Sequence, residues 1–202
     1  MKTLVLISCV MLSICGCILA STLTFDDIPN ANAPFPYLTN GYQSLNWSNF
    51  AVLNAVNEAS VNSTNGAYYG MVSISNAAFN AYGNPSEIDA RGTNFNFLSA
   101  YLTGGWNSNL NIQVQGFRNG FLIFDQTVIA SATNATLFNF GFLNIDRLCF
   151  NSFGGQPAFG PVSQSTFVMD NFTFEFIPEP STVLLTGAGA FLLWAMLKRK
   201  RG

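Results

Sequence analysis

Apolar and polar residues alternate along the central part of the chain. One side of the segment 110–115 carries Leu110, Ile112 and Val114, and the other side carries amide side chains. This alternation is typical of an antiparallel strand with one buried and one solvated face. No apolar stripe with helical spacing continues for more than two turns between residues 21 and 176. The pattern therefore predicts an all-β domain.

A hairpin is predicted where Asn119-Gly120 follows this strand, because Asn-Gly readily adopts the positive φ values of a tight turn. The next segment, 121–129, is apolar on both faces, so we expect it in the centre of a sheet. Short strands at regular spacing and the absence of an internal repeat predict an antiparallel β-sandwich of the jelly-roll type over 21–176. Further strands are expected at 23–25, 50–55, 69–75, 95–101, 138–142, 145–150 and 172–176.

The first 20 residues have the order of a secretory signal peptide. Lys2 precedes an apolar run at 4–19, and Ala20-Ser21 offers small residues for cleavage. An alternative is a lipoprotein signal in which Cys17 is the lipidated residue. Both interpretations predict export of the domain that follows.

A second apolar segment lies near the C-terminus. Residues 181–197 would form a helix of about 25 Å, close to the shortest length that spans a membrane. The basic tail 198–201 is expected to stay in the cytoplasm, so the domain would lie outside. A single transmembrane helix is therefore predicted, preceded by Pro178-Glu179-Pro180.

This C-terminal order, Pro178-Glu179-Pro180 followed by an apolar helix and a basic cluster, resembles the PEP-CTERM sorting signal. The resemblance covers 178–202, and the sorting segment is predicted over 177–202. It implies a Gram-negative bacterium that makes exopolysaccharide, and an exosortase-type processing enzyme as partner. The domain would be anchored in the inner membrane and then passed to the cell envelope, the surface or the extracellular matrix. The alternative is an anchor that stays uncut.

The amino-acid composition excludes several classes of catalytic and metal-binding site. The chain has no histidine, and the segment 21–176 has no lysine and a single cysteine, Cys149. Histidine-based catalytic triads, histidine metal sites and lysine Schiff bases are therefore excluded. Three arginines face nine carboxylates in this segment, an acidic excess that disfavours nucleic acid as a partner.

The aromatic-rich, charge-poor segment 22–176 resembles the galactose-binding-like jelly rolls that serve as carbohydrate-binding modules. This resemblance implies a non-enzymatic protein that binds, or is embedded in, the exopolysaccharide of a biofilm matrix. A structural surface protein without a specific ligand is the alternative. The resemblance is carried by Leu23-Thr24-Phe25-Asp26-Asp27, Phe97-Leu98-Ser99-Ala100-Tyr101 with Trp106, and Phe167-Val168-Met169-Asp170-Asn171-Phe172.

Acidic residues follow the first predicted strand and stand at the beginning of the last one. If the terminal strands pair, Asp26 and Asp27 come close to Asp170 and Asn171. Carboxylate and amide oxygens are the ligands that calcium prefers. We therefore predict a structural calcium site, with hydrogen-bonded turn capping as the alternative.

Sugar recognition needs aromatic faces and polar groups that bond hydroxyls. Tyr42, Trp47 and Trp106 are the predicted contacts, with Tyr37 and Asn107 as further candidates. The alternative is that these aromatic residues fill the rim of the core.

A glycoside hydrolase is a less favoured possibility, because it would need two carboxylates at a suitable separation. The candidates are Glu58, Glu87 and Asp89, which could equally be solvated loop charges.

Overall fold

The computed structural model describes residues 19–29, 31–62 and 65–177. One sheet, sheet A, contains β1 (Ser21–Leu23), β3 (Phe50–Asn54), β4 (Asn76–Asn80), β6 (Phe95–Gly104), β10 (Thr136–Ile145) and β13 (Phe167–Phe176). Sheet B contains β2 (Asn46–Ser48), β5 (Ser86–Asp89), β8 (Leu110–Arg118), β9 (Phe121–Ala130) and β11 (Arg147–Phe153). A small ribbon pairs β7 (Asn107–Ser108) with β12 (Gln156–Pro157), and the two α-helices are α1 (Ala55–Asn62) and α2 (Gly66–Gly70).

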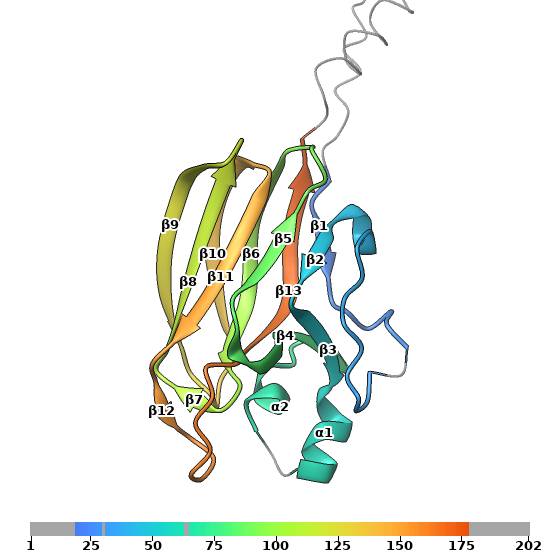
Figure 1. The fold of residues 1–202 in the computed structure, drawn as a ribbon. Helices are drawn as coiled ribbons and strands as arrows, with labels where there is room; N and C mark the ends of the chain where they lie inside the picture. Colours follow the sequence, from blue (N-terminus) through green and yellow to red (C-terminus); the bar gives the residue numbers. More distant parts are fainter. Residues whose placement is uncertain (1–18, 30, 63–64, 178–202) are drawn as a thin grey trace, which may run out of the picture.

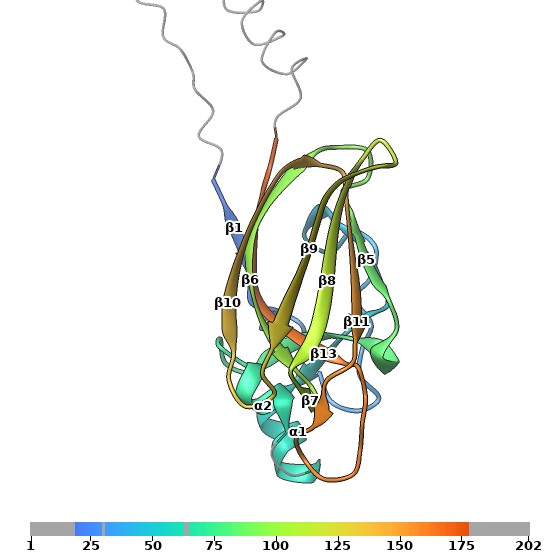
Figure 2. The same cartoon turned by 90° about the vertical axis from the view of Figure 1, so that its left-hand side faces the viewer.

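The two large sheets pack face to face, as the view along their edges shows (Figure 2). Sheet A has the order β10-β6-β13-β4-β3, with β1 beside β13, and sheet B has the order β2-β5-β11-β8-β9. Every strand pair is antiparallel. The predicted antiparallel β-sandwich is confirmed. The chain crosses from one sheet to the other several times, a path typical of jelly rolls.

Alternating residues build the core between the sheets. Leu110, Ile112 and Val114 are fully buried, as their spacing predicts. Phe97 lies at the centre, stacked on Phe140 and Phe172 with ring centroids 4.7 and 4.9 Å away. Each fully buried phenylalanine stabilises the fold by about 1.5–3 kcal/mol. A phenylalanine-rich core therefore suffices to hold a domain whose one described cysteine, Cys149, is free.

The prediction that 121–129 forms a central strand is wrong. β9 lies at the edge of sheet B and pairs only with β8, and the side chain of Phe121 is 73% exposed. After β9 the chain crosses to sheet A as β10, so no strand covers the other edge of β9. Leu122, Ile123 and Ile129 are 48%, 40% and 62% exposed, so apolar residues on both faces of β9 did not mark a strand covered on both sides.

The predicted strand at 69–75 is also wrong. Tyr69 and Gly70 end α2, and 71–75 is irregular. The side chain of Asn65 starts this helix, because its Oδ1 accepts a hydrogen bond from the backbone N–H of Ala67 at 2.9 Å. An N-cap followed by only five helical residues leaves too short an apolar stripe to detect in the sequence.

Two other predictions are confirmed. Asn119 and Gly120 form the β8–β9 turn with φ values of 52° and 80°. The terminal strands lie side by side, with Ser21 opposite Phe174. Both chain ends therefore leave the sandwich at the same end, while α1, α2, β7 and β12 lie at the opposite end (Figure 1).

The sandwich thus has a tail end and a distal end. The tail end consists of the points where the chain ends leave, Ser21 and Ile177, and the turns at 90–94, 118–120 and 146. The distal end consists of residues 54–62, 65–70, 104–109, 131–135 and 154–166.

The predicted terminal segments lie outside the described residues. These are the signal peptide with Cys17, the Pro178-Glu179-Pro180 motif, the helix 181–197 and the basic tail 198–201. Within the part of the chain that the structure describes, neither α1 nor any other helix has the length and hydrophobicity needed to cross a membrane.

Candidate functional site

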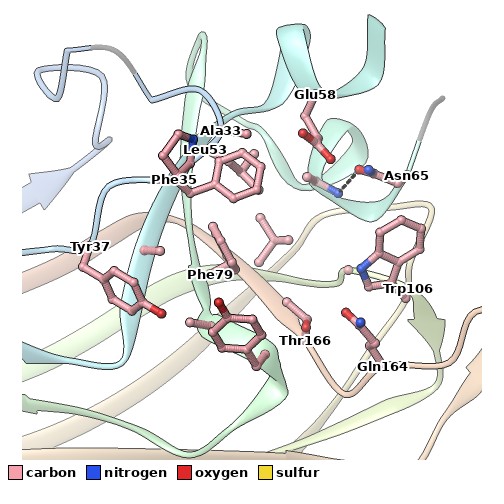
Figure 3. A pocket seen from close by; sticks show the side chains of 17 residues that line it. Ala33, Phe35, Tyr37, Leu53, Glu58, Asn65, Phe79, Trp106, Gln164 and Thr166 are labelled. Carbon is pink, nitrogen blue, oxygen red and sulfur yellow. Dashed lines mark hydrogen bonds between the residues drawn. The ribbon is translucent and has the colours of Figure 1, made fainter. Parts of the chain in front are cut away.

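A pocket of about 480 Å³ lies on the outer face of sheet A at the distal end (Figure 3). Its floor uses the strand positions that point away from the core. Phe50 and Val52 of β3 point inward, so Ala51 and Leu53 point outward and line the pocket. Helix α1 contributes Glu58 to its wall, and Asn65, the N-cap of α2, lies in the wall as well.

Aromatic rings dominate the lining. Tyr37 lies at one side of the pocket and Trp106 at the other, with Phe35 and Phe79 between them (Figure 3). The rings of Phe35 and Phe79 meet edge to face, with centroids 5.5 Å apart. Tyr82 completes the set and is 82% exposed. Such rings can stack on the apolar face of a sugar or another flat ligand.

Tyr82 is displayed by a strained turn between β4 and β5. Its φ of 58° and ψ of 15° are unusual for a bulky residue, and Gly83 follows with a φ of 70°. Asn80 anchors the turn, because its side chain donates to the carbonyl of Asn84 at 3.0 Å and accepts from the N–H of Phe167 at 2.7 Å. Strain that exposes a large aromatic side chain is typical of a binding surface.

Few polar groups accompany the rings. Glu58 supplies the one carboxylate among the described residues that line the pocket, and Asn65, Gln164 and Thr166 supply amide and hydroxyl groups. Ligand pockets commonly combine a largely apolar lining with a few polar groups that fix orientation. This arrangement suits binding, since hydrolysis of a glycosidic bond would need a second carboxylate.

Charge is almost absent around the pocket. Glu58 is the single charged residue between Asp27 and Glu87, and the sequence has no charged residue in 92–117, 126–145 or 148–169. Every other segment of the distal end is therefore formally neutral. An electrically neutral ligand fits this surface best.

The sequence-predicted aromatic contacts separate into two groups. Trp106 and Tyr37 line the pocket, whereas Tyr42 and Trp47 do not. The prediction of Trp47 as a ligand contact is corrected: its side chain is 4% exposed, and its ring meets Phe50 edge to face at 5.3 Å. Trp47 points into the sandwich because it is the inward residue of the three-residue strand β2.

Tyr42 and Asn107 have structural partners. The hydroxyl of Tyr42 donates to Asp27 Oδ1 at 2.7 Å. Burial, together with this carboxylate, raises the pKa of Tyr42 well above its usual value. Asn107 is buried and donates to the carbonyl of Gly154 at 3.0 Å and to Ser163 Oγ at 3.1 Å. Neither side chain lines the pocket.

The predicted calcium ligands form hydrogen bonds with different parts of the chain. Asp170 is fully buried and accepts the N–H groups of Val72 and Ser73, each at 2.7 Å. Burial raises the pKa of Asp170, although these hydrogen bonds oppose the rise. Asp26 instead accepts the N–H of Asn76 at 2.8 Å.

Within the part of the chain that the structure describes, no group of three or more His, Cys, Asp or Glu could hold a metal ion. Asn171 Oδ1 is buried without a hydrogen-bond partner, but a single free oxygen falls short of the six to eight that calcium takes. These residues therefore do not form a calcium-type ligand set. Calcium binding stays a prediction, and a melting temperature unchanged by a chelator would reject it.

The other two candidate carboxylates lie on sheet B, away from the pocket. Glu87 forms an ion pair with Arg147 at 3.1 Å. Asp89 accepts the backbone N–H of Arg91 at 2.7 Å. Glu58 is therefore separated from both, and the structure does not bring the three together as an acid pair.

Sequence reasoning missed much of the lining, including Phe35, Phe79 and Tyr82. One signal was present for Tyr82, because Gly83-Asn84-Pro85 marks a turn that would expose the preceding residue. No comparable signal marked Phe35 and Phe79, since their role depends on which strand face the helices leave open.

No protein-family model and no curated protein matches the chain. Among solved structures, the chain is similar to TmCBM61 in complex with β-1,4-galactotriose, at 10% identity and a TM-score of 0.36, covering 71% of this chain and 99% of that one. It is also similar to the K1 cleaved adhesin domain of Lys-gingipain from Porphyromonas gingivalis W83, at 10% identity and a TM-score of 0.38, covering 80% and 99%. Likeness at this level carries no argument about function, which rests on the residues described above.

Proposed function

We propose that this chain is an exported, non-enzymatic surface or matrix protein that binds a neutral polysaccharide through the pocket at its distal end. The observation that carries this proposal is the combination of Tyr37, Tyr82 and Trp106 around a pocket with a single carboxylate. Aromatic faces accept the C–H side of a sugar ring, and the amide and hydroxyl groups of Asn65, Gln164 and Thr166 can bond its hydroxyls.

The orientation of the domain supports this function. If the C-terminal segment is a PEP-CTERM signal handled by an exosortase, the tail end faces the inner membrane before processing. β13 runs from the pocket to the tail end, and its ten residues cover roughly 33 Å. The pocket would then face away from the envelope of a Gram-negative cell, towards the extracellular polysaccharide.

Retention of the purified protein on immobilised glycans tests the proposal. The panel should contain neutral and acidic polysaccharides, and β-1,4-galactan is a practical member. We expect retention on at least one neutral glycan, little affected by salt, because neutral ligands leave no charge to screen. Trp106→Ala should weaken retention at least about tenfold, from the loss of one stacked aromatic ring and its apolar contact.

Phe121→Ala is the matched control, because Phe121 is an exposed aromatic residue beside the tail end. It should bind as the wild type does. Absence of retention on every glycan would contradict the proposal and favour a structural surface protein without a specific ligand. Release of sugar that Glu58→Gln abolishes would instead favour a hydrolase.

A further inference from the structure

A second group of aromatic rings lies beside the pocket, on α2 and the loop after β12. The rings of Tyr69 and Phe159 are nearly parallel, with centroids 6.1 Å apart and 9° between their planes. Tyr68 meets Tyr69 edge to face at 5.8 Å. Tyr68 and Tyr69 remain 44% and 39% exposed. We call Tyr68, Tyr69 and Phe159 the aromatic platform.

The platform is held firmly in place. Gly66 N donates to the carbonyl of Gly105 at 2.9 Å, which fixes α2 against the end of β6. A Cβ on Gly66 would lie 1.8 Å from the carbonyl oxygen of Gly104, so the two backbones are in direct contact. The loop that carries Phe159 is held by the side chain of Asn107, which donates hydrogen bonds to the carbonyl of Gly154 and to Ser163 Oγ.

Trp106 connects the platform to the pocket. It lies between Asn65 of the pocket wall and Gln164 (Figure 3). The carbonyl of Trp106 accepts the N–H of Ala158 at 2.9 Å, and Ala158 is the neighbour of Phe159. Asn65, on the other side, caps the helix that carries Tyr68 and Tyr69. Trp106 is therefore joined to the platform through Ala158 on one side and through Asn65 on the other.

We propose that the aromatic platform is a second subsite for the same neutral polysaccharide chain, so that the domain binds an extended stretch of glycan. This inference rests on the proposed function of the pocket. The occupant is a glycan chain because the platform is linked by the backbone to Trp106 of the pocket and, like the pocket, lies among neutral residues, with no charge in 59–86 or 148–169. Exposed aromatic rings without nearby charge suit stacking on uncharged sugar rings.

Binding as a function of chain length tests the second subsite. The probes are size-graded oligosaccharides, from disaccharide to long oligomer, prepared from the neutral polysaccharide that retains the wild-type protein. Affinity should rise with length and then level off. Tyr69→Ala should leave the affinity for short oligomers unchanged and lower that for long ones about three- to tenfold, the range expected for one lost stacking contact.

Tyr69→Phe is the matched control, because it keeps the ring that stacks on Phe159 and removes only the hydroxyl. It should bind long oligomers as the wild type does. Trp106→Ala should weaken binding at every length.

If Trp106→Ala loses binding while Tyr69→Ala matches the wild type at every length, the pocket is supported and the second subsite is overturned. If Tyr69→Ala weakens short and long oligomers equally, the platform acts on the pocket's shape and the second subsite is likewise overturned. If no glycan retains the wild-type protein, both proposals fail together.

Discussion

The two ends of the sandwich are built from the same strands but differ in chemistry. At the tail end, carboxylates close the turns: Asp89 caps Arg91 and Asp146 accepts the N–H of Asn119. At the distal end the segments other than α1 carry no charge and contain closely packed glycines and exposed aromatic rings.

The side chains at the tail end serve stability, whereas those at the distal end serve binding. Carboxylates that hold turns at the tail end satisfy backbone N–H groups and need no ligand. Aromatic rings left open at the distal end bury less apolar surface than core positions would, so their exposure costs stability that a ligand can restore. The distal end is therefore the part of the molecule expected to respond to a partner.

The largest loss of stability is expected from Asp170→Asn. This substitution disrupts the hydrogen bonds that join β13 to the irregular segment after α2. The asparagine NH₂ would face either the N–H groups of Val72 and Ser73, which share Asp170 Oδ2, or the N–H of Asn171 at Oδ1. A backbone donor therefore loses its acceptor in both orientations. We expect the free energy of unfolding to fall by about 3–4 kcal/mol. Urea unfolding measures this, and a loss below about 1 kcal/mol would contradict the assigned role.

Glycine substitutions at the two ends should differ in their effect on stability. In Gly66→Ala the new Cβ would lie 1.8 Å from the carbonyl oxygen of Gly104, so α2 must shift; we expect a loss of about 3 kcal/mol. Gly92→Ala, at the tail end, meets no atom within 4 Å and should cost about 1 kcal/mol for its positive φ of 85°. Thermal unfolding of both variants checks this order, and equal losses would show that the distal backbone is not tightly packed.

A smaller effect is expected from Cys149, which lies on the outer face of sheet B. Burial, followed by the nearby Glu87 carboxylate, raises the pKa of the Cys149 thiol from 9.0 to about 11. The folded state therefore favours the neutral thiol. This contribution to stability is complete below pH 9 and is lost as the pH rises through about 11.

Unfolding measured between pH 8 and pH 11 should show a steeper decline for the wild type than for Cys149→Ala. Parallel curves for the two proteins would contradict the raised pKa.

The sequence predicted the elements whose alternation or turn residues are local. Leu110, Ile112 and Val114 marked a buried strand face, and Asn119-Gly120 marked a hairpin, and both predictions are confirmed. Properties that depend on neighbours were not predictable. The edge position of β9 is set by where the chain crosses next, and Phe79 lines a pocket because two short helices leave that part of sheet A open.

The candidate site was only partly predictable for the same reason. Trp106 and Trp47 look alike in the sequence, yet one lines the pocket and the other is buried among Phe25, Phe50 and Phe172. Strand alternation could have placed Trp47 inside, but β2 has only three residues and its pattern is too short to read.

Hydroxyl-radical footprinting with and without the retained neutral polysaccharide locates the binding surface, because it reports the exposure of individual aromatic residues in the pocket and at the tail end. We expect the polysaccharide to protect Tyr37, Tyr82 and Trp106 and to leave the modification of Phe121 unchanged. Protection of Phe121 with no change at these three pocket residues would contradict the assignment of binding to the pocket.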